Sequence, residues 1–144
     1  MAKGNMQVLN MLNTKYFINQ RQQLQVNNAA NGVAWFVNDI IEVKDPMSEI
    51  KGLDSLNTKQ SAVILASEFN KEDYDNVGDG NGSIELDKYL PNKLQYSVNN
   101  NTNQFAVFSE IWYGKNDSWK AYIDGKEANI VRVNYVLRGL EIPA

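Results

Sequence analysis

Short runs of strand-forming residues follow one another along most of this chain, and this succession constrains its fold more than any other feature. Runs rich in β-branched and aromatic residues, such as residues 33–45 and 61–69, alternate with clusters of asparagine, aspartate and glycine. About one residue in seven is asparagine, which tolerates left-handed backbone conformations and forms Asx turns. The sequence therefore predicts a mainly β fold, an antiparallel β-sandwich of jelly-roll or immunoglobulin-like type, with one or two short helices.

The stretch from residue 118 to residue 130 gives the sharpest local prediction. Asp124 and Gly125 stand between two strand-like runs, a pattern that favours a two-residue type I′ turn because both turn positions need a positive φ. Side chains alternate across a strand, so Trp119 lies on the apolar face of this hairpin and Tyr122 on the polar face. We therefore expect Trp119 to pack in the core. Tyr122 should face solvent, as a ligand contact or as a cross-strand neighbour.

Two segments show helical patterns. Residues 1–15 contain apolar side chains spaced three and four apart, which predicts a short amphipathic N-terminal helix. A second helix should begin at Pro46, with Asp45 as its N-cap. A chain of 144 residues is long enough to bury a substantial core, so we expect residues 1–144 to form a single soluble domain.

The composition excludes several classes of site. The chain has no cysteine and no histidine, which rules out disulfides, thiolate or histidine metal ligands, and Ser-His-Asp or Cys-His catalysis. The net charge of −3 and the lack of a Lys/Arg block argue against nucleic acid as a partner. No glycine-rich phosphate loop of Rossmann or Walker type is present, and we expect no cofactor. No run approaches the roughly 18 apolar residues that span a bilayer.

Residues 71–83 form an acidic, glycine-rich segment with two interpretations. Asp73, Asp75 and Asp79 could serve as ligands of a calcium loop, since carboxylate oxygens are the ligands that calcium prefers. The EF-hand pattern itself fails, because valine and leucine occupy two of its ligand positions. We therefore favour a flexible loop without metal and keep the calcium loop as the alternative.

Glu110 is the candidate for unusual chemistry. It falls in a run of apolar residues, where a carboxylate should be paired or have a raised pKa. Arg132 and Arg138 are candidate partners in the C-terminal run, and an ion pair at the sheet rim is favoured over an active-site acid. A glycoside hydrolase would need a second carboxylate nearby, and only Asp124 or Glu127 is plausible. We therefore expect a non-catalytic domain.

Five segments of the chain form an ordered series. They read, from the N-terminus, LNMLNTKYFI, AWFV, YLPNKLQYSVN, FAVFSEIWYGKNDSWKAYIDGKEA and RVNYVLRGLEIPA. The series resembles the C-terminal soluble region of YfhO-like bacterial membrane proteins of the Bacteroidetes type, and it extends from Leu9 to Ala144. Its most specific part comprises three motifs, Ser109–Tyr113, Trp119–Lys126 and Asn134–Arg138.

This resemblance implies a parent protein with many transmembrane helices, similar to the lipid-linked-sugar glycosyltransferases of the C superfamily. The β-rich region of that family lies on the extracytoplasmic, periplasmic side of the cytoplasmic membrane. Its catalytic acids belong to loops near the membrane helices, so the resemblance assigns no catalytic residue to this chain. The family pattern continues past the last residue seen here, and we expect the chain to be a piece of a larger multi-pass membrane protein.

Two functions follow as expectations. The first is an accessory domain that positions a glycan or acceptor, or packs on the transmembrane portion of its own polypeptide, with a cell-envelope glycan as a candidate ligand. The alternative is a free-standing secreted carbohydrate-binding or adhesive module. A hydrolase that uses Glu110 is a third, less favoured reading. Aromatic rings stack on sugars and planar polar groups bind their hydroxyls. The ligand-binding residues expected on this basis are Glu110, Tyr113, Lys120, Tyr122, Asp124, Arg132 and Arg138.

Overall fold

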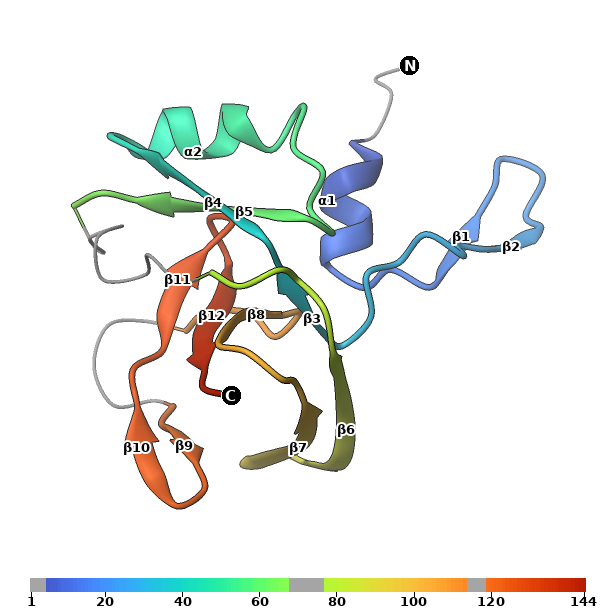
Figure 1. The fold of residues 1–144 in the computed structure, drawn as a ribbon. Coiled ribbons are helices and arrows are strands. Elements are labelled where there is room, and N and C mark those ends of the chain that lie inside the picture. Colours follow the sequence, from blue (N-terminus) through green and yellow to red (C-terminus); the bar gives the residue numbers. More distant parts are fainter. Residues whose placement is uncertain (1–4, 68–76, 114–118) are drawn as a thin grey trace.

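A computed structural model describes residues 5–67, 77–113 and 119–144 of the chain (Figure 1). The elements, in chain order, are α1 (Met6–Met11), β1 (Tyr16–Ile18), β2 (Leu24–Val26), β3 (Ala34–Val37), β4 (Asp39–Val43), α2 (Pro46–Gly52), β5 (Ser61–Leu65), β6 (Ser83–Leu90), β7 (Lys93–Asn99), β8 (Gln104–Phe108), β9 (Ala121–Ile123), β10 (Lys126–Ala128), β11 (Val131–Val133) and β12 (Leu137–Ile142). Strands dominate and the helices are short. The predicted mainly β, sandwich-like fold with short helices is therefore confirmed.

The centre of the molecule is a four-stranded antiparallel sheet in the order β11-β12-β8-β3. Strand β8 lies inside this sheet, and Ala106 in β8 pairs with Leu140 in β12 on one side and with Phe36 in β3 on the other. Because side chains alternate along each strand, the neighbouring residues Phe105 and Val107 project from the opposite face. The sheet therefore has two apolar faces, and both need a cover.

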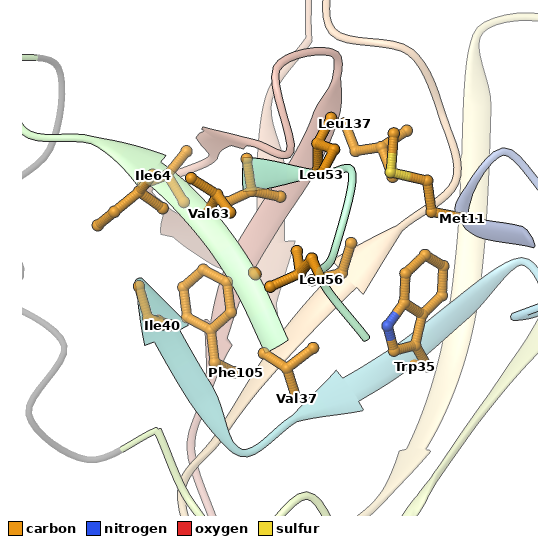
Figure 2. Close-up of a cluster of buried hydrophobic side chains, with 14 residues drawn as sticks. Met11, Trp35, Val37, Ile40, Leu53, Leu56, Val63, Ile64, Phe105 and Leu137 are labelled. Carbon is orange, nitrogen blue, oxygen red and sulfur yellow. The ribbon is translucent and has the colours of Figure 1, made fainter. Parts of the chain in front are cut away.

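One face is covered by α1, by strands β4 and β5, and by the segment that follows α2 (Figure 1). Figure 2 shows this core, in which Met11 from α1 and Val63 from β5 belong to the same cluster as Trp35 and Phe105 of the sheet. The indole N–H of Trp35 donates a hydrogen bond of 2.9 Å to the carbonyl of Thr58. A buried indole N–H needs such a partner, so this bond lets the large ring stay in the core.

The other face is covered by two hairpins, β6–β7 and β9–β10 (Figure 1). Its small cluster contains Phe36, Ala106 and Leu140 from the sheet, and partly buried residues of both hairpins pack against it. In β9–β10, the turn residues Asp124 and Gly125 have φ values of 49° and 81°. Tyr122 pairs with Glu127, Ala121 with Ala128 and Ile123 with Lys126, so the predicted hairpin and its register are confirmed.

Helix α2 begins where the sequence predicts. The Asp45 carboxylate accepts a hydrogen bond of 2.9 Å from the Ser48 N–H, and Pro46 occupies the first turn. The helix connects β4 to β5, which pair in parallel from Asp39 opposite Ser61 onward. This parallel pair is an exception within an otherwise antiparallel set of sheets. The helices contain six and seven residues, and none in the described part of the chain is long and apolar enough to cross a membrane.

The turn between β11 and β12 is tied to the helical layer by buried polar contacts. Glu49 of α2 is fully buried, and its Oε2 lies 3.1 Å from Nη1 of Arg132. The Tyr135 N–H donates a hydrogen bond of 2.8 Å to the other carboxylate oxygen. Asn134 and Val63 exchange two hydrogen bonds, of 2.8 and 2.9 Å. These contacts fix the position of the sheet relative to α2 and β5.

Gly139→Ala should destabilise the central sheet. A Cβ at Gly139 would lie 2.6 Å from Cζ of Phe105 and 2.9 Å from Cγ1 of Val133, so the side chains around it would have to move. Overpacking of this kind costs about 1–3 kcal/mol, measurable by urea unfolding. The matched control is Gly52→Ala, where the nearest atom is 3.6 Å away and alanine favours the helix. Equal unfolding midpoints for wild type and Gly139→Ala would contradict the packing described.

Arg132→Met should destabilise the fold more strongly. It would leave the buried Glu49 carboxylate without the guanidinium beside it, and removal of one partner of a buried ion pair costs about 3–5 kcal/mol. The double variant Glu49→Gln/Arg132→Met removes the buried charge as well and should recover part of the loss. Urea unfolding of Arg132→Met, of Glu49→Gln and of the double variant tests this coupling. Additive effects of the two substitutions would rule it out.

Candidate functional site

The seven residues expected to bind a ligand fall into three groups. Three of them lie around the end of β8 and the start of β12, three lie on the β9–β10 hairpin, and one lies beside α2. The group around β8 and β12 contains Glu110, Tyr113 and Arg138. The hairpin group contains Lys120, Tyr122 and Asp124, and the residue beside α2 is Arg132. The structure therefore does not bring all seven together.

Arg138 connects the segment after β8 to the start of β12 and to Trp119. It is only 7% exposed, and its Nε and Nη2 donate hydrogen bonds of 3.1 and 2.7 Å to the carbonyl of Ile111. Its guanidinium lies 4.5 Å from the ring centroid of Trp119. Trp119 is half-buried and stacks on this cation at the rim, so its expected place in the core is wrong. Burial lowers the pKa of Arg138, and the nearby Glu110 carboxylate acts in the opposite direction.

Glu110 lies in a different environment from the one expected. Strand β8 ends at Phe108, so Glu110 is in the half-buried segment after the strand and not on its core face. Arg132, expected as one of its partners, pairs with Glu49 instead. Of the two expected partners, Arg138 is the one whose charge interacts with Glu110. Among the described residues, the fully buried carboxylate is that of Glu49.

Tyr96 joins this cluster from the β6–β7 hairpin. The pKa of Tyr96 is raised to about 12, mainly by burial and then by the Glu110 carboxylate, while Arg138 acts in the opposite direction. The Tyr96 ring meets the ring of Phe108 edge-on, with centroids 5.0 Å apart. Tyr113, which is 64% exposed, is the accessible aromatic residue of the group. Most of this cluster is thus engaged in holding the segment after β8 against the sheet.

The hairpin residues form a separate, solvent-facing group. Nζ of Lys120 lies 3.5 Å from a carboxylate oxygen of Glu127, and Tyr122 stands opposite Glu127 in the register. Tyr122 is exposed as predicted, and Asp124 occupies the first turn position. Exposed ion pairs contribute little to stability. The side chains of Lys120, Tyr122 and Asp124 are all exposed to solvent.

A pocket of about 300 Å³ lies elsewhere, at the edge where β6 and β8 begin and β7 ends. Hydroxyl and carboxamide side chains and one carboxylate dominate its lining, with no cationic or aromatic side chain among the residues that line it. We call this the amide pocket. Its lining residues are Asp79, Asn81, Gly82, Ser83, Asn99, Asn100, Asn101, Thr102 and Gln104.

Gln104 holds the wall of the amide pocket in place. The side chain is 1% exposed, and its Oε1 accepts a hydrogen bond of 2.9 Å from the Gly80 N–H. Its Nε2 donates to the Asp79 carboxylate at 2.6 Å and to the Thr102 hydroxyl at 2.9 Å. One buried carboxamide therefore connects both segments that form the pocket.

Glycines allow the two segments to approach each other closely. Gly78 and Gly82 have φ values of 81° and 125°, a conformation that other residues rarely adopt. A Cβ at Gly78 would clash with the carbonyl of Asn103, and one at Gly82 would clash with the carbonyl of Asn99. The 77–82 segment is thus closely packed against the turn that joins β7 to β8.

Asp79 is the charged group of the amide pocket. Its carboxylate accepts hydrogen bonds from the backbone N–H of Asn81 at 2.9 Å, from Gln104 at 2.6 Å and from the Asn81 side chain at 2.8 Å. These bonds, the backbone one first, lower the pKa of Asp79 to about 2. The other two residues of the calcium interpretation, Asp73 and Asp75, lie outside the described residues. Within the described ranges, no group of three or more acidic side chains could hold a metal ion.

The amide pocket is not predicted from the sequence, because its lining contains neither aromatic rings nor paired charges. Two signals were visible. Residues 99–101 are three consecutive asparagines, and glycines alternate with polar residues from Gly78 to Gly82. Both patterns are typical of turns, and only the pairing of β6 with β7 and the turn into β8 bring them together.

The pKa of Asp79 predicts a specific acid response. Its folded value of about 2 lies below the ordinary 3.8, so the stabilising contribution is complete above about pH 4 and is lost as pH falls through about 2. Asp79→Asn should therefore give a smaller loss of unfolding free energy between pH 4 and pH 2 than wild type. Urea unfolding across this range measures it. Parallel pH curves for the two proteins would show that the carboxylate makes no such contribution.

Comparison with known proteins adds no further identification. No family description, curated protein or solved structure matches this chain. The resemblance to YfhO-like proteins therefore stays a prediction from the ordered motifs, and the assignment of a site depends on the geometry of the amide pocket and of the Arg138 cluster.

Proposed function

We propose that this chain is a non-catalytic glycan-binding domain that serves a larger cell-envelope protein. The observation that carries the binding part is the amide pocket, whose lining combines carboxamides, hydroxyls and one carboxylate. A sugar ring presents several hydroxyl groups, each of which both donates and accepts hydrogen bonds. Carboxamides offer a donor and an acceptor on one planar group, and the carboxylate accepts.

The charge of the pocket selects the ligand class. Asp79 stays ionised at neutral pH, and no cationic side chain belongs to the lining, so phosphate and other anions are disfavoured. Apolar ligands are disfavoured as well, since they would desolvate the carboxamides without replacing their hydrogen bonds. A neutral polyhydroxyl compound fits both conditions. The volume of about 300 Å³ is at the lower end of ligand pockets, which suits one or two sugar rings.

The accessory role is supported by the resemblance to YfhO-like membrane proteins. Residues of the motif series have structural roles in this fold: Asp124 and Gly125 form the β9–β10 turn, and Trp119 stacks on Arg138. These motif residues therefore stabilise the fold, and the amide pocket lies elsewhere, where β6 and β8 begin and β7 ends. In this proposal the domain positions an acceptor glycan on the extracytoplasmic side, next to the transmembrane portion of its own polypeptide.

The binding part can be tested by NMR titration of backbone amides with neutral monosaccharides and oligosaccharides of cell envelopes. We expect shifts at Asn81 and at residues 99–102, with a dissociation constant of about 1 mM, or −4.1 kcal/mol, for a single ring. Asn101→Ala should weaken binding several-fold because it removes a donor and an acceptor from the lining. Tyr122→Ala, on the solvent face of the β9–β10 hairpin, is the control that should leave it unchanged.

The pattern of shifts decides between the candidate sites. Shifts centred on Tyr113 and Tyr122 would show that the aromatic residues bind the glycan and would contradict binding in the amide pocket. No shift with any neutral glycan would leave only packing on the membrane portion. A free-standing module would use the same pocket, so attachment is tested separately, by the presence of transmembrane segments in the native polypeptide.

A further inference from the structure

Strands β1 and β2 form an arm that projects from the body of the molecule (Figure 1). We define the arm as residues 15–27. Its strands pair only with each other among the described residues, with Tyr16 opposite Val26 and Ile18 opposite Leu24. These four side chains share one face of the arm, because directly paired residues point the same way. They are between 59% and 76% exposed.

Such an arm needs a partner. A two-stranded hairpin alone is marginally stable in water, since it gains too little burial to offset the ordering of its chain. Four large apolar side chains on one exposed face also exceed the scattered apolar residues normal on a monomer surface, and such patches mark interaction sites. None of the four belongs to either core cluster.

Charge indicates what the partner carries. The first 38 residues contain three Lys or Arg residues and no Asp or Glu, so all 17 acidic residues lie in the rest of the chain. Lys15 and Arg21 are the two cations of the arm itself. The arm is therefore basic and the body acidic, and electrostatic complementarity favours contact between the arm of one copy and the body of another.

The layer formed by β4 and α2 offers a matching surface. It presents the apolar side chains Ile41, Met47 and Ile50, which are 40%, 58% and 41% exposed. The exposed acidic residues of the same segment, Asp39, Glu42 and Asp45, outnumber its exposed lysines, Lys44 and Lys51. Apolar contact surrounded by opposite charges is the pattern found in specific protein interfaces, where an apolar centre has a polar rim.

The tip of the arm disfavours a lipid bilayer as the partner. Residues 19–23 read Asn-Gln-Arg-Gln-Gln. Insertion tip-first would take four carboxamides and a guanidinium out of water, which is costly. A folded protein surface can instead leave this tip in solvent and cover only the apolar face.

We propose that the arm of one copy docks by its apolar face on the β4–α2 layer of a second copy, and that the contact is reciprocal. A two-fold axis then makes both contacts identical, as in most homodimers. The arm is ordered by this contact, and its four exposed apolar residues become buried. The proposal is independent of glycan binding, because the amide pocket involves neither the arm nor α2.

Sedimentation velocity and light scattering over a range of concentrations test the dimer. Wild type should change from the mass of one chain to that of two as concentration rises. Ile18→Asp/Leu24→Asp should weaken this association at least tenfold, because it places charge on the buried face. Gln25→Asp is the control, since it adds one carboxylate on the opposite face of β2, where the arm variant adds two on the apolar face, and the dimer should persist.

The β4–α2 side is tested by Met47→Asp, which should also give the mass of one chain. Mixing the arm variant with Met47→Asp should restore a weaker dimer, because one of the two reciprocal contacts is then intact. Unfolding midpoints equal to that of wild type serve as the folding control.

Three results would overturn the proposal: a wild type that stays monomeric at every concentration, a dimer that survives the arm variant, or a mixture that does not associate. Binding of monomeric wild type, but not of the arm variant, to anionic phospholipid vesicles would reassign the arm to a membrane surface.

Discussion

The buried carboxylate of Glu49 fixes how the two halves of this fold meet. A charge removed from water must be paired and hydrogen-bonded, and Glu49 meets this need through Arg132 and the Tyr135 N–H, both near the β11–β12 turn. The turn therefore has one position relative to α2. Strand β12 continues from it and pairs along β8, and β8 begins with Gln104, which holds the amide pocket. The pocket is thus positioned through strands anchored at the opposite end of the sheet.

Charged and neutral polar residues have different roles in this molecule. Arg132 and Arg138 look like ligand-binding groups in the sequence, but the first pairs with a buried acid and the second binds a backbone carbonyl and an aromatic ring. The asparagines at 99–101 look like ordinary turn residues and line a pocket. Burial makes the arginines costly to expose or remove, so they are committed to the fold. The carboxamides keep hydrogen-bonding capacity that a ligand can use.

The features that the sequence predicted correctly depend on neighbouring residues. The β9–β10 hairpin follows from the demand of Asp124 and Gly125 for positive φ, and α2 follows from the Asp45 cap and Pro46. The errors concern partners distant in the chain. The sequence offers both Arg132 and Arg138 as partners of Glu110, because nothing local shows that Glu49, from another layer, binds Arg132. The sequence gives no signal for strand β2, because Leu24 and Val26 lie in a polar run and, among the described residues, β2 pairs only with β1. The amide pocket likewise requires segments from 79–83 and 99–104 to meet, which no local pattern indicates.

The uneven distribution of charge connects the two proposed surfaces. With every acidic residue beyond position 38, the body repels anions, and this agrees with a pocket whose only charge is the Asp79 carboxylate. The same acidic body attracts the basic arm of a second copy. The arm leaves the body on the side of α1 and the amide pocket lies at the edge of β6 and β8, so the arm lies away from the pocket of its own copy (Figure 1). The proposed dimer contains one such pocket in each copy. Two copies would then present two identical weak sites, and a polymeric glycan that reaches both would bind more tightly than a single sugar ring, with no change in either pocket.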